Sequence, residues 1–148
     1  MFSINIDSDI ISEIKELDID LLIPHEEVLL NKKDILKNNL KYNNNDIIIS
    51  TIIICNESNL IIDGHHRYTA LKELGYKKIP VTLINYFSNS IITDDNDSLS
   101  KMEIINNSVS KKLYSPKTTK HLVYCNNNKS WFPITLLSSL YLIKSIKI

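Results

Sequence analysis

Asp63, Gly64, His65, His66 and Arg67 form an unbroken run of residues that could handle a phosphate group. Arg67 is the only arginine in the chain, and Gly64 is one of its two glycines. A guanidinium group grips phosphate oxygens through paired hydrogen bonds, and glycine lets the backbone approach a ligand closely. Asp63 could hold Mg²⁺ or accept a proton. Phosphoryl transfer needs this combination, because it depends on positioning and charge neutralisation.

The run is expected where a strand turns into a helix. Residues 60–62 have the pattern of a strand, and residues 65–74 have that of a helix that ends before Gly75. The first N–H groups of a helix lack intrahelical partners and favour an anion. A second interpretation is a plain strand-to-helix corner, in which Asp63 caps the helix, His66 packs and Arg67 makes a surface ion pair.

Two further segments carry candidate functional groups. His25, Glu26 and Glu27 follow a predicted strand and Pro24, and a carboxylate there could take the proton of an alcohol. Glu27 would point elsewhere on a helix, and both acids could instead be ordinary first-turn residues favoured by the helix dipole. Residues 117–121, Lys-Thr-Thr-Lys-His, suit a carboxylate or phosphate ligand, but they could also form a solvated basic loop.

The hydrophobic pattern predicts an α/β (α+β) core of order β-α-β-β-α-β within residues 19–87. Its expected elements are a strand at 19–23, a helix within 26–40, strands at 47–54 and 60–62, a helix at 65–74 and a strand at 81–86. This pattern indicates a small sheet with flanking helices.

The regions outside this core are expected to be mainly helical. Residues 1–18 have apolar positions at helical spacing and predict a short helix or an arm, and residues 99–109 and 131–148 predict two more helices. The polar stretch 89–98 reads as a linker. We therefore expect a domain at 1–88, this linker, and a C-terminal segment at 99–148.

Composition restricts the classes of function. The formal net charge is zero, which argues against non-specific nucleic-acid binding. Cys55 and Cys125 lie far apart without metal-ligand spacing, which favours a reducing compartment. No signal peptide is evident, and no apolar run approaches the roughly 20 residues that span a bilayer, so a cytoplasmic location without membrane contact is expected.

Three segments in order resemble a known family. Residues 61–75, with Ile79-Pro80-Val81 after them, resemble the signature of the ParB/sulfiredoxin fold, and the closest branch is that of the free L-serine kinases. Residues 22–28 resemble the family's I-P-H-E segment. Residues 115–121 resemble its P-P-K-T-T-R-H segment, with Ser115 and Lys120 as departures. The resemblance covers residues 19–87 and a patch at 113–137.

The resemblance implies a kinase that transfers a phosphoryl group from ATP or ADP to free L-serine, with Mg²⁺ held by Asp63. Lys120 keeps the positive charge of the family's arginine, but it lacks the planar guanidinium group that can bind two oxygens at once. The implied catalytic residues are Glu26, Asp63 and His66; nucleotide would contact Gly64, His65, His66, Arg67 and Thr69; and L-serine would contact His25, Lys117, Thr118, Thr119, Lys120 and His121.

The fold also admits other activities. One is a ParB-like nucleotide-binding regulator or DNA-binding module without kinase activity, although no helix-turn-helix is legible after residue 87. Sulfiredoxin chemistry would need a cysteine where His65 stands. A non-catalytic binding module is a further alternative, because the C-terminal part is shorter than in the serine kinases. The pattern does not predict an oligomeric state.

Overall fold

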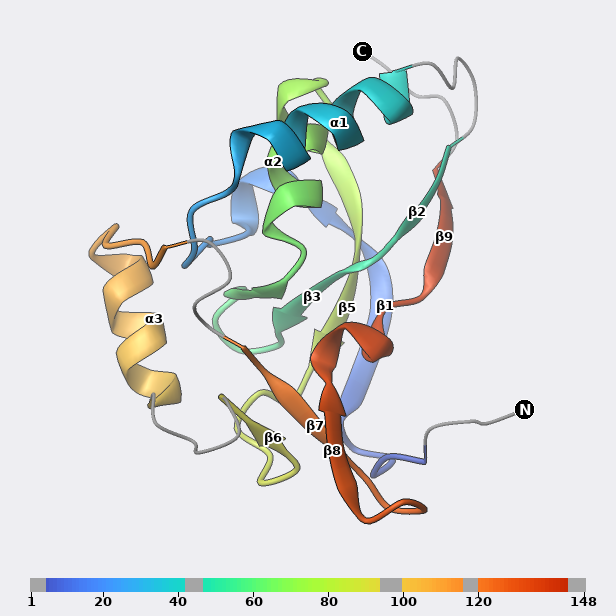
Figure 1. Ribbon diagram of the computed structural model, residues 1–148, viewed down its shortest axis with the longest axis vertical. Helices are drawn as coiled ribbons and strands as arrows, with labels where there is room; N and C mark the ends of the chain where they lie inside the picture. The colour runs from blue at the N-terminus through green and yellow to red at the C-terminus, as the bar shows by residue number, and fades with distance from the viewer. Residues whose placement is uncertain (1–4, 42–46, 94–99, 116–119, 144–148) are drawn as a thin grey trace.

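The computed structural model describes residues 5–41, 47–93, 100–115 and 120–143, and Figure 1 shows their arrangement. The described helices are α1 (Leu30–Lys41), α2 (His65–Glu73) and α3 (Lys101–Val109), with short 3₁₀ turns η1 (Ile19–Leu21) and η2 (Ile134–Leu137). The described strands are β1 (Ile11–Asp18), β2 (Ile47–Ser50), β3 (Ile52–Cys55), β4 (Ile61–Asp63), β5 (Lys78–Ile84), β6 (Ile91–Ile92), β7 (Leu122–Cys125), β8 (Ser130–Pro133) and β9 (Leu140–Ile143).

The central sheet has the strand order β1-β5-β3-β4. Strand β3 runs parallel to β5 and antiparallel to β4, while β1 is antiparallel to β5 along its length. Strands β2 and β9 form a separate two-stranded ribbon, and β6, β7 and β8 form a three-stranded sheet. The predicted α+β class is therefore confirmed.

Strand β3 of the central sheet is buried on both faces, because its alternate residues enter two different cores. Ile52 and Ile54 belong to a core with Tyr68 and Leu71 of α2, whereas Ile53 enters a second core. The second core is completed by α3, β7 and η2 through Ile104, Val123, Ile134 and Leu137. A strand covered on both faces explains why Ile52, Ile53 and Ile54 follow one another without a polar residue.

Helix α1 lies beside α2 in Figure 1, and an ion-pair network joins them. Glu73 at the end of α2 accepts hydrogen bonds from Lys33 and Lys37 of α1 at 3.0 and 3.1 Å. Lys33 also pairs with Asp34 at 2.7 Å, and these acids raise the pKa of Lys33. The network fixes α1 against the helix that begins at the Asp-Gly-His-His-Arg run.

The structure corrects three expectations in the N-terminal half. Residues 11–18 form a strand and not a helix, because they pair with β5 from Ile11 to Asp18. The expected strand at 19–23 is the turn η1, with one isolated bridge from Ile23 to Leu60. The expected single strand at 47–54 is two strands in different sheets, with Thr51 between them.

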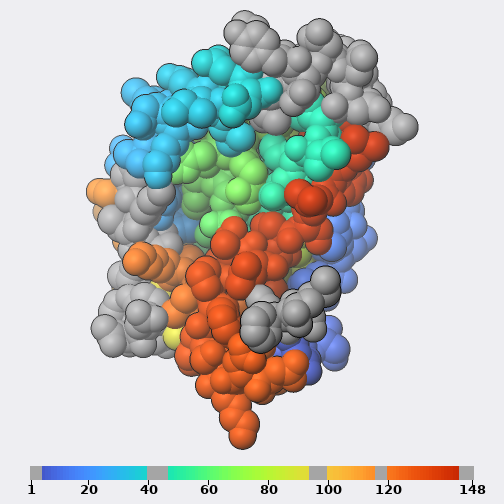
Figure 2. All heavy atoms as spheres, turned by 45° about the vertical axis from the view of Figure 1, so that its right-hand side comes forward, coloured from blue at the N-terminus to red at the C-terminus, as the bar shows by residue number. Residues whose placement is uncertain are grey.

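The expected terminal helix at 131–148 is wrong for its described part. Residues 130–143 form β8, η2 and β9, and β9 pairs with β2 from Ile143–Ile47 to Leu140–Ser50. In Figure 2 the chain between these elements crosses the surface and ends beside β2. The C-terminal part is thus largely β-structure, and it is hydrogen-bonded to the part that carries the Asp-Gly-His-His-Arg run.

Of the expected helices and strands, α1, β4, α2, β5 and α3 are confirmed within a few residues. Cys55 and Cys125 are both buried free thiols. Within the described residues, no helix is long and apolar enough to cross a membrane.

Candidate functional site

The first turn of α2 begins at a glycine, which has no side chain to cap the helix. Its N-cap residue is Gly64, which adopts φ 106° and ψ 25°, a left-handed conformation that favours glycine. No side chain caps the helix, so Asp63 does not play the capping role of the second interpretation. The uncapped N–H groups and the helix dipole favour an anion at this position.

Arg67 folds back over Gly64. A Cβ atom added at Gly64 would lie 2.9 Å from Arg67 Nη2, so only glycine leaves room for the guanidinium there. Arg67 Nη2 donates to the carbonyl oxygen of Thr51 at 3.1 Å and lies 3.5 Å from Asp63 Oδ2. Arg67 Nε is buried and has no hydrogen-bond partner among the described residues. A buried charged donor without a partner is costly to the folded state.

His65 and His66 hold the segment 25–29 against the start of α2. The backbone N–H of His25 donates to His65 Nε2 at 3.1 Å, and that of Leu29 donates to His66 Nε2 at 3.0 Å. Because an imidazole nitrogen that accepts an N–H bond carries no proton, any proton on these neutral rings sits on Nδ1. Glu26 therefore lies on a segment that is anchored to the first turn of α2 on both sides.

Three histidines from distant segments gather beside this turn. The ring of His25 lies 4.6 Å from that of His65 and 5.8 Å from that of His121, centroid to centroid. His25 Nδ1 donates to the carbonyl oxygen of Ile61 at 2.6 Å, and Tyr86 Oη is 2.8 Å from His121 Nε2. All three histidines are buried.

Burial lowers the pKa of His25 and lowers the pKa of His65 well below its usual value. The nearby imidazoles of His25, His121 and His66 further disfavour a charge on His65. Glu26 acts in the opposite direction on His25. We therefore expect His25 and His65 to be neutral at pH 7, so that Arg67 supplies the fixed positive charge at the start of α2.

Glu26 is buried, whereas Glu27 is exposed. A parallel bridge joins Glu26 to Tyr114, with the N–H of Glu27 donating to the Tyr114 carbonyl at 2.7 Å. The N–H of Tyr114 in turn donates to the carbonyl of His25 at 2.8 Å. The C-terminal part of the chain thus helps to fix the carboxylate that we predict as a base.

The remaining predicted site residues, Thr69, Lys120 and His121, differ in burial and in hydrogen bonding. Thr69 donates its hydroxyl to the carbonyl oxygen of His65 at 2.9 Å, a bond within the helix. Lys120 is exposed, and next to it His121 is buried. Lys117, Thr118 and Thr119 lie outside the described residues. The structure thus gathers His25, Glu26, Asp63, the Gly64–Arg67 run and His121 around one helix start.

Sequence analysis missed Thr51, Tyr86 and Tyr114, which contact predicted site residues directly. Thr51 holds Arg67, Tyr86 holds His121, and Tyr114 holds the His25–Glu27 backbone. One signal was available for Thr51, since it places a hydroxyl inside a run of isoleucines. The two tyrosines carried no such signal.

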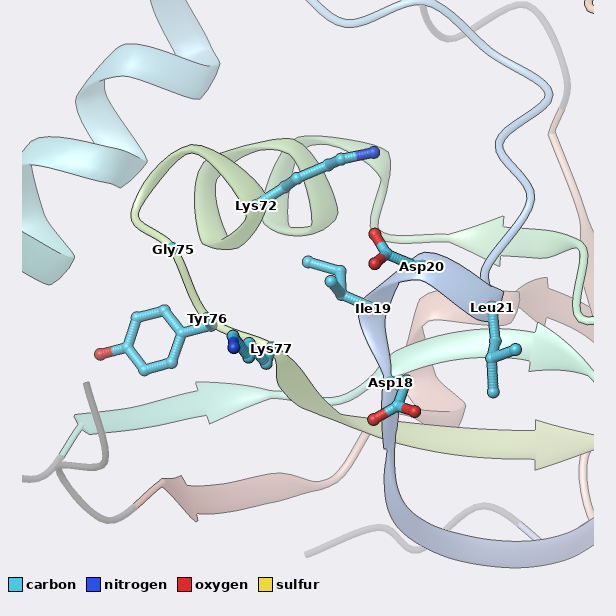
Figure 3. Close-up of a pocket in the computed structure, with 8 residues that line it drawn as sticks. All are labelled: Asp18, Ile19, Asp20, Leu21, Lys72, Gly75, Tyr76 and Lys77. Carbon is cyan, nitrogen blue, oxygen red and sulfur yellow. The ribbon is translucent and has the colours of Figure 1, made fainter. Parts of the chain in front are cut away.

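A separate surface pocket of about 490 Å³ lies at the other end of α2 (Figure 3). Lys72 of α2 and Asp20 of η1 face the same space, while the Tyr76 ring points away. Asp20, Lys72 and Lys77 are exposed, and no predicted site residue lines this pocket. It is therefore distinct from the cluster at the helix start.

Comparisons with known proteins agree with this fold. No protein-family model matches the chain. A glutamate-to-glutamine variant of free serine kinase, solved with AMP, superposes with a TM-score of 0.64 at 14% identity, covering 82% of this chain and 91% of that one. The mixed sheet with its strand–Asp-Gly-His-His-Arg–helix element thus has the α+β fold of free serine kinase.

Two curated relatives narrow the relationship. The chain is 42% identical over 80 residues to the ATP-dependent L-serine kinase of Staphylothermus marinus, covering 51% of this chain and 31% of that protein. It is 34% identical over 115 residues to a ParB-like protein of Sulfolobus acidocaldarius, covering 72% and 56%. The sequence relatives of the chain are thus L-serine kinases and a ParB-like protein, in agreement with the resemblance of the Asp-Gly-His-His-Arg run. The matched segments span about a third and about half of these relatives.

Proposed function

We propose that this chain is a kinase that transfers a phosphoryl group from ATP or ADP to free L-serine and releases O-phospho-L-serine. The observation that carries the proposal is the placement of Glu26. It lies on a segment that His65 and His66 anchor to the uncapped start of α2, where Arg67 stands. The identity to the Staphylothermus L-serine kinase over 80 residues supports the same reaction.

The nucleotide phosphates would bind at the start of α2. Its backbone N–H groups and the fork of Arg67 would neutralise the charge that the phosphates carry and that spreads over the transferred group. The partial exposure of Arg67 supports this role, because 20% of its side chain is accessible to a ligand. His65 and His66 would act mainly by holding residues 25–29, and their Nδ1 sides remain candidates for contact with the nucleotide.

Glu26 would serve as the general base. Its carboxylate would take the proton of the serine hydroxyl as the oxygen attacks the terminal phosphorus, while the bond to the leaving ADP or AMP oxygen breaks. His25, His121, Lys120 and residues 117–119 are proposed to bind the carboxylate end of L-serine. Lysine at 120 would do so as a point charge, without a bidentate grip.

The residues present fit a magnesium ion that arrives with the nucleotide. No group of three potential ligands stands ready among the described residues, and Mg²⁺ is commonly held by one or two carboxylates together with substrate phosphates. Asp63 would supply that carboxylate, since it is only partly buried and lies beside Arg67. The ion would neutralise phosphate charge.

The decisive test is incubation of the purified chain with labelled L-serine and Mg²⁺, with ATP in one arm and ADP in the other. Formation of O-phosphoserine with either donor is expected, and its absence with both would reject the kinase. The identity to a ParB-like protein over 72% of the chain favours one alternative, a nucleotide-binding regulator. That alternative predicts nucleotide binding without phosphoserine, and a DNA-binding form of it predicts a salt-dependent shift of duplex DNA.

A further inference from the structure

Thr51 is a fully buried polar residue at the junction of two sheets. It separates β2, which pairs with β9, from β3, which pairs with β4 and β5. A threonine inside a run of isoleucines is unexpected in an apolar core unless its polar groups are satisfied. Its N–H, its carbonyl and its hydroxyl all have partners, and these come from three parts of the chain: Ser139, Thr82 of β5 and Arg67 of α2.

The hydroxyl and N–H of Thr51 are tied to the C-terminal segment. Thr51 N donates to the carbonyl of Ser139 at 2.8 Å, and Ser139 N donates to Thr51 Oγ1 at 2.9 Å. Thr51 Oγ1 also lies 2.7 Å from Thr82 Oγ1 of β5. These three bonds hold the residue from two sides, so its carbonyl has little freedom to move.

That carbonyl is the contact that orients Arg67. The distance of 3.1 Å to Nη2 is within normal hydrogen-bond range, whereas Asp63 at 3.5 Å is beyond the usual length of a charge-assisted bond. Gly64 provides only space, because it has no side chain. Among the described residues, Thr51 is therefore the firm polar anchor of the guanidinium.

We propose that Thr51 is a positioning residue for Arg67, and that through Thr51 the backbone of Ser139 tunes nucleotide binding without touching the nucleotide. The inference rests on the proposed function, in which Arg67 grips the nucleotide phosphates. It gives the C-terminal segment a second role, separate from the proposed contact of residues 117–121 with L-serine. If Thr51 shifts, the guanidinium group of Arg67 loses its orientation but keeps its positive charge.

The chain offers a direct readout, because it contains a single arginine. The Nε–H group of Arg67 therefore gives one side-chain resonance in a nitrogen–proton NMR spectrum, without need for assignment. Three variants are compared with the wild type in the absence of nucleotide. Thr51→Val removes the hydroxyl but keeps the branched shape, Thr51→Ser keeps the hydroxyl, and Thr82→Val removes only the second hydroxyl of the pair.

We expect Thr51→Val to shift or broaden the Arg67 Nε–H resonance and Thr51→Ser to leave it near the wild-type position. In the same samples, Thr51→Val should weaken nucleotide binding about five- to tenfold, a change comparable with one net hydrogen bond. Turnover at saturating nucleotide should fall as well, since the same guanidinium group would stabilise the charge of the transferred phosphoryl group.

An unchanged Arg67 resonance in folded Thr51→Val protein, or equal loss in Thr51→Ser, would overturn the inference. If Thr51→Val does not fold, Thr82→Val carries the test, and a wild-type resonance in that variant would overturn it equally. The NMR measurement does not depend on kinase activity. A wild-type protein that makes no phosphoserine but shows the Thr51-dependent shift would refute the kinase and leave the positioning role standing.

Discussion

His65 Nε2 accepts a hydrogen bond of 3.1 Å from the backbone N–H of His25, 40 residues earlier in the chain. The bond joins the first turn of α2 to the segment that carries Glu26. It also fixes the protonation of the ring, because Nε2 cannot accept this bond once it holds a proton. The same ring therefore links the geometry of the site to pH.

Stability should fall as the pH drops below about 6.5. Burial lowers the pKa of both His25 and His65, so the unfolded chain takes up protons near the ordinary value of 6.5 before the folded chain does. Each such histidine then reduces the free energy of unfolding by up to about 1.4 kcal/mol per pH unit until its folded-state pKa is reached. Urea denaturation between pH 8 and about 5.5 measures the slope.

The His65→Leu variant provides the comparison. It should be less stable at pH 8, because leucine has no acceptor for the His25 N–H, but its stability should depend less steeply on pH. A slope equal to that of the wild type would show that His65 does not carry the effect. Glu26, His66 and His121 are the neighbouring titratable groups, and Glu26 opposes the shift of His25.

The sequence predicted the α2 start well because its signals are local. Two isoleucines before Asp63, a glycine at the turn, and Ala70, Leu71 and Leu74 on one helix face are read without knowledge of the rest of the fold. The bonds from His65 and His66 to residues 25 and 29 are long-range and fall on backbone atoms. Side-chain types alone could not reveal them.

The elements that were predicted wrongly from the sequence share a physical cause. Ile11, Ile14 and Leu17 have helical spacing, as do Leu136, Leu140 and Ile143, but the first set pairs with β5 and the last strand pairs with β2. Tertiary pairing overrides short helical patterns. Residues 47–54 are β-branched on both sides of Thr51, so periodicity could not show that the two halves belong to different sheets.

Glu26→Gln should abolish turnover and leave nucleotide binding intact. The amide keeps the size of the side chain but cannot take the proton of an alcohol, and a general base contributes at least about a hundredfold to the rate. Phosphoserine formation and nucleotide titration measure the two quantities. Glu27→Gln is the matched control, because Glu27 is adjacent but exposed. Equal loss of turnover in both variants would contradict the assignment.

Arg67→Ala should weaken nucleotide binding by about ten- to a hundredfold, the range expected when hydrogen bonds to a charged group are lost. Arg67→Lys separates charge from shape, since lysine keeps the positive charge but lacks the planar fork. We expect an intermediate affinity for this variant in calorimetric titration. Wild-type affinity in Arg67→Ala would place the phosphates away from this residue.

Gly64→Ala and Gly75→Ala form a matched pair at the two ends of α2. Both glycines have positive φ, 106° and 88°, so each alanine costs about 1–2 kcal/mol of backbone strain. At Gly75 the new Cβ meets nothing within 4 Å, whereas at Gly64 it lies 2.9 Å from Arg67 Nη2 and 3.2 Å from Ile52 Cγ1. Only the substitution at Gly64 should displace Arg67.

We therefore expect thermal or urea denaturation to show a loss of stability in both variants, and a larger one in Gly64→Ala. Nucleotide titration should show weaker binding in Gly64→Ala alone, because the displaced guanidinium loses the Thr51 carbonyl. Gly75→Ala carries the same kind of backbone strain. It therefore shows how much a loss of stability alone changes nucleotide binding. Equal nucleotide affinity in the two folded variants would mean that the close approach of Arg67 to Gly64 has no part in binding the ligand.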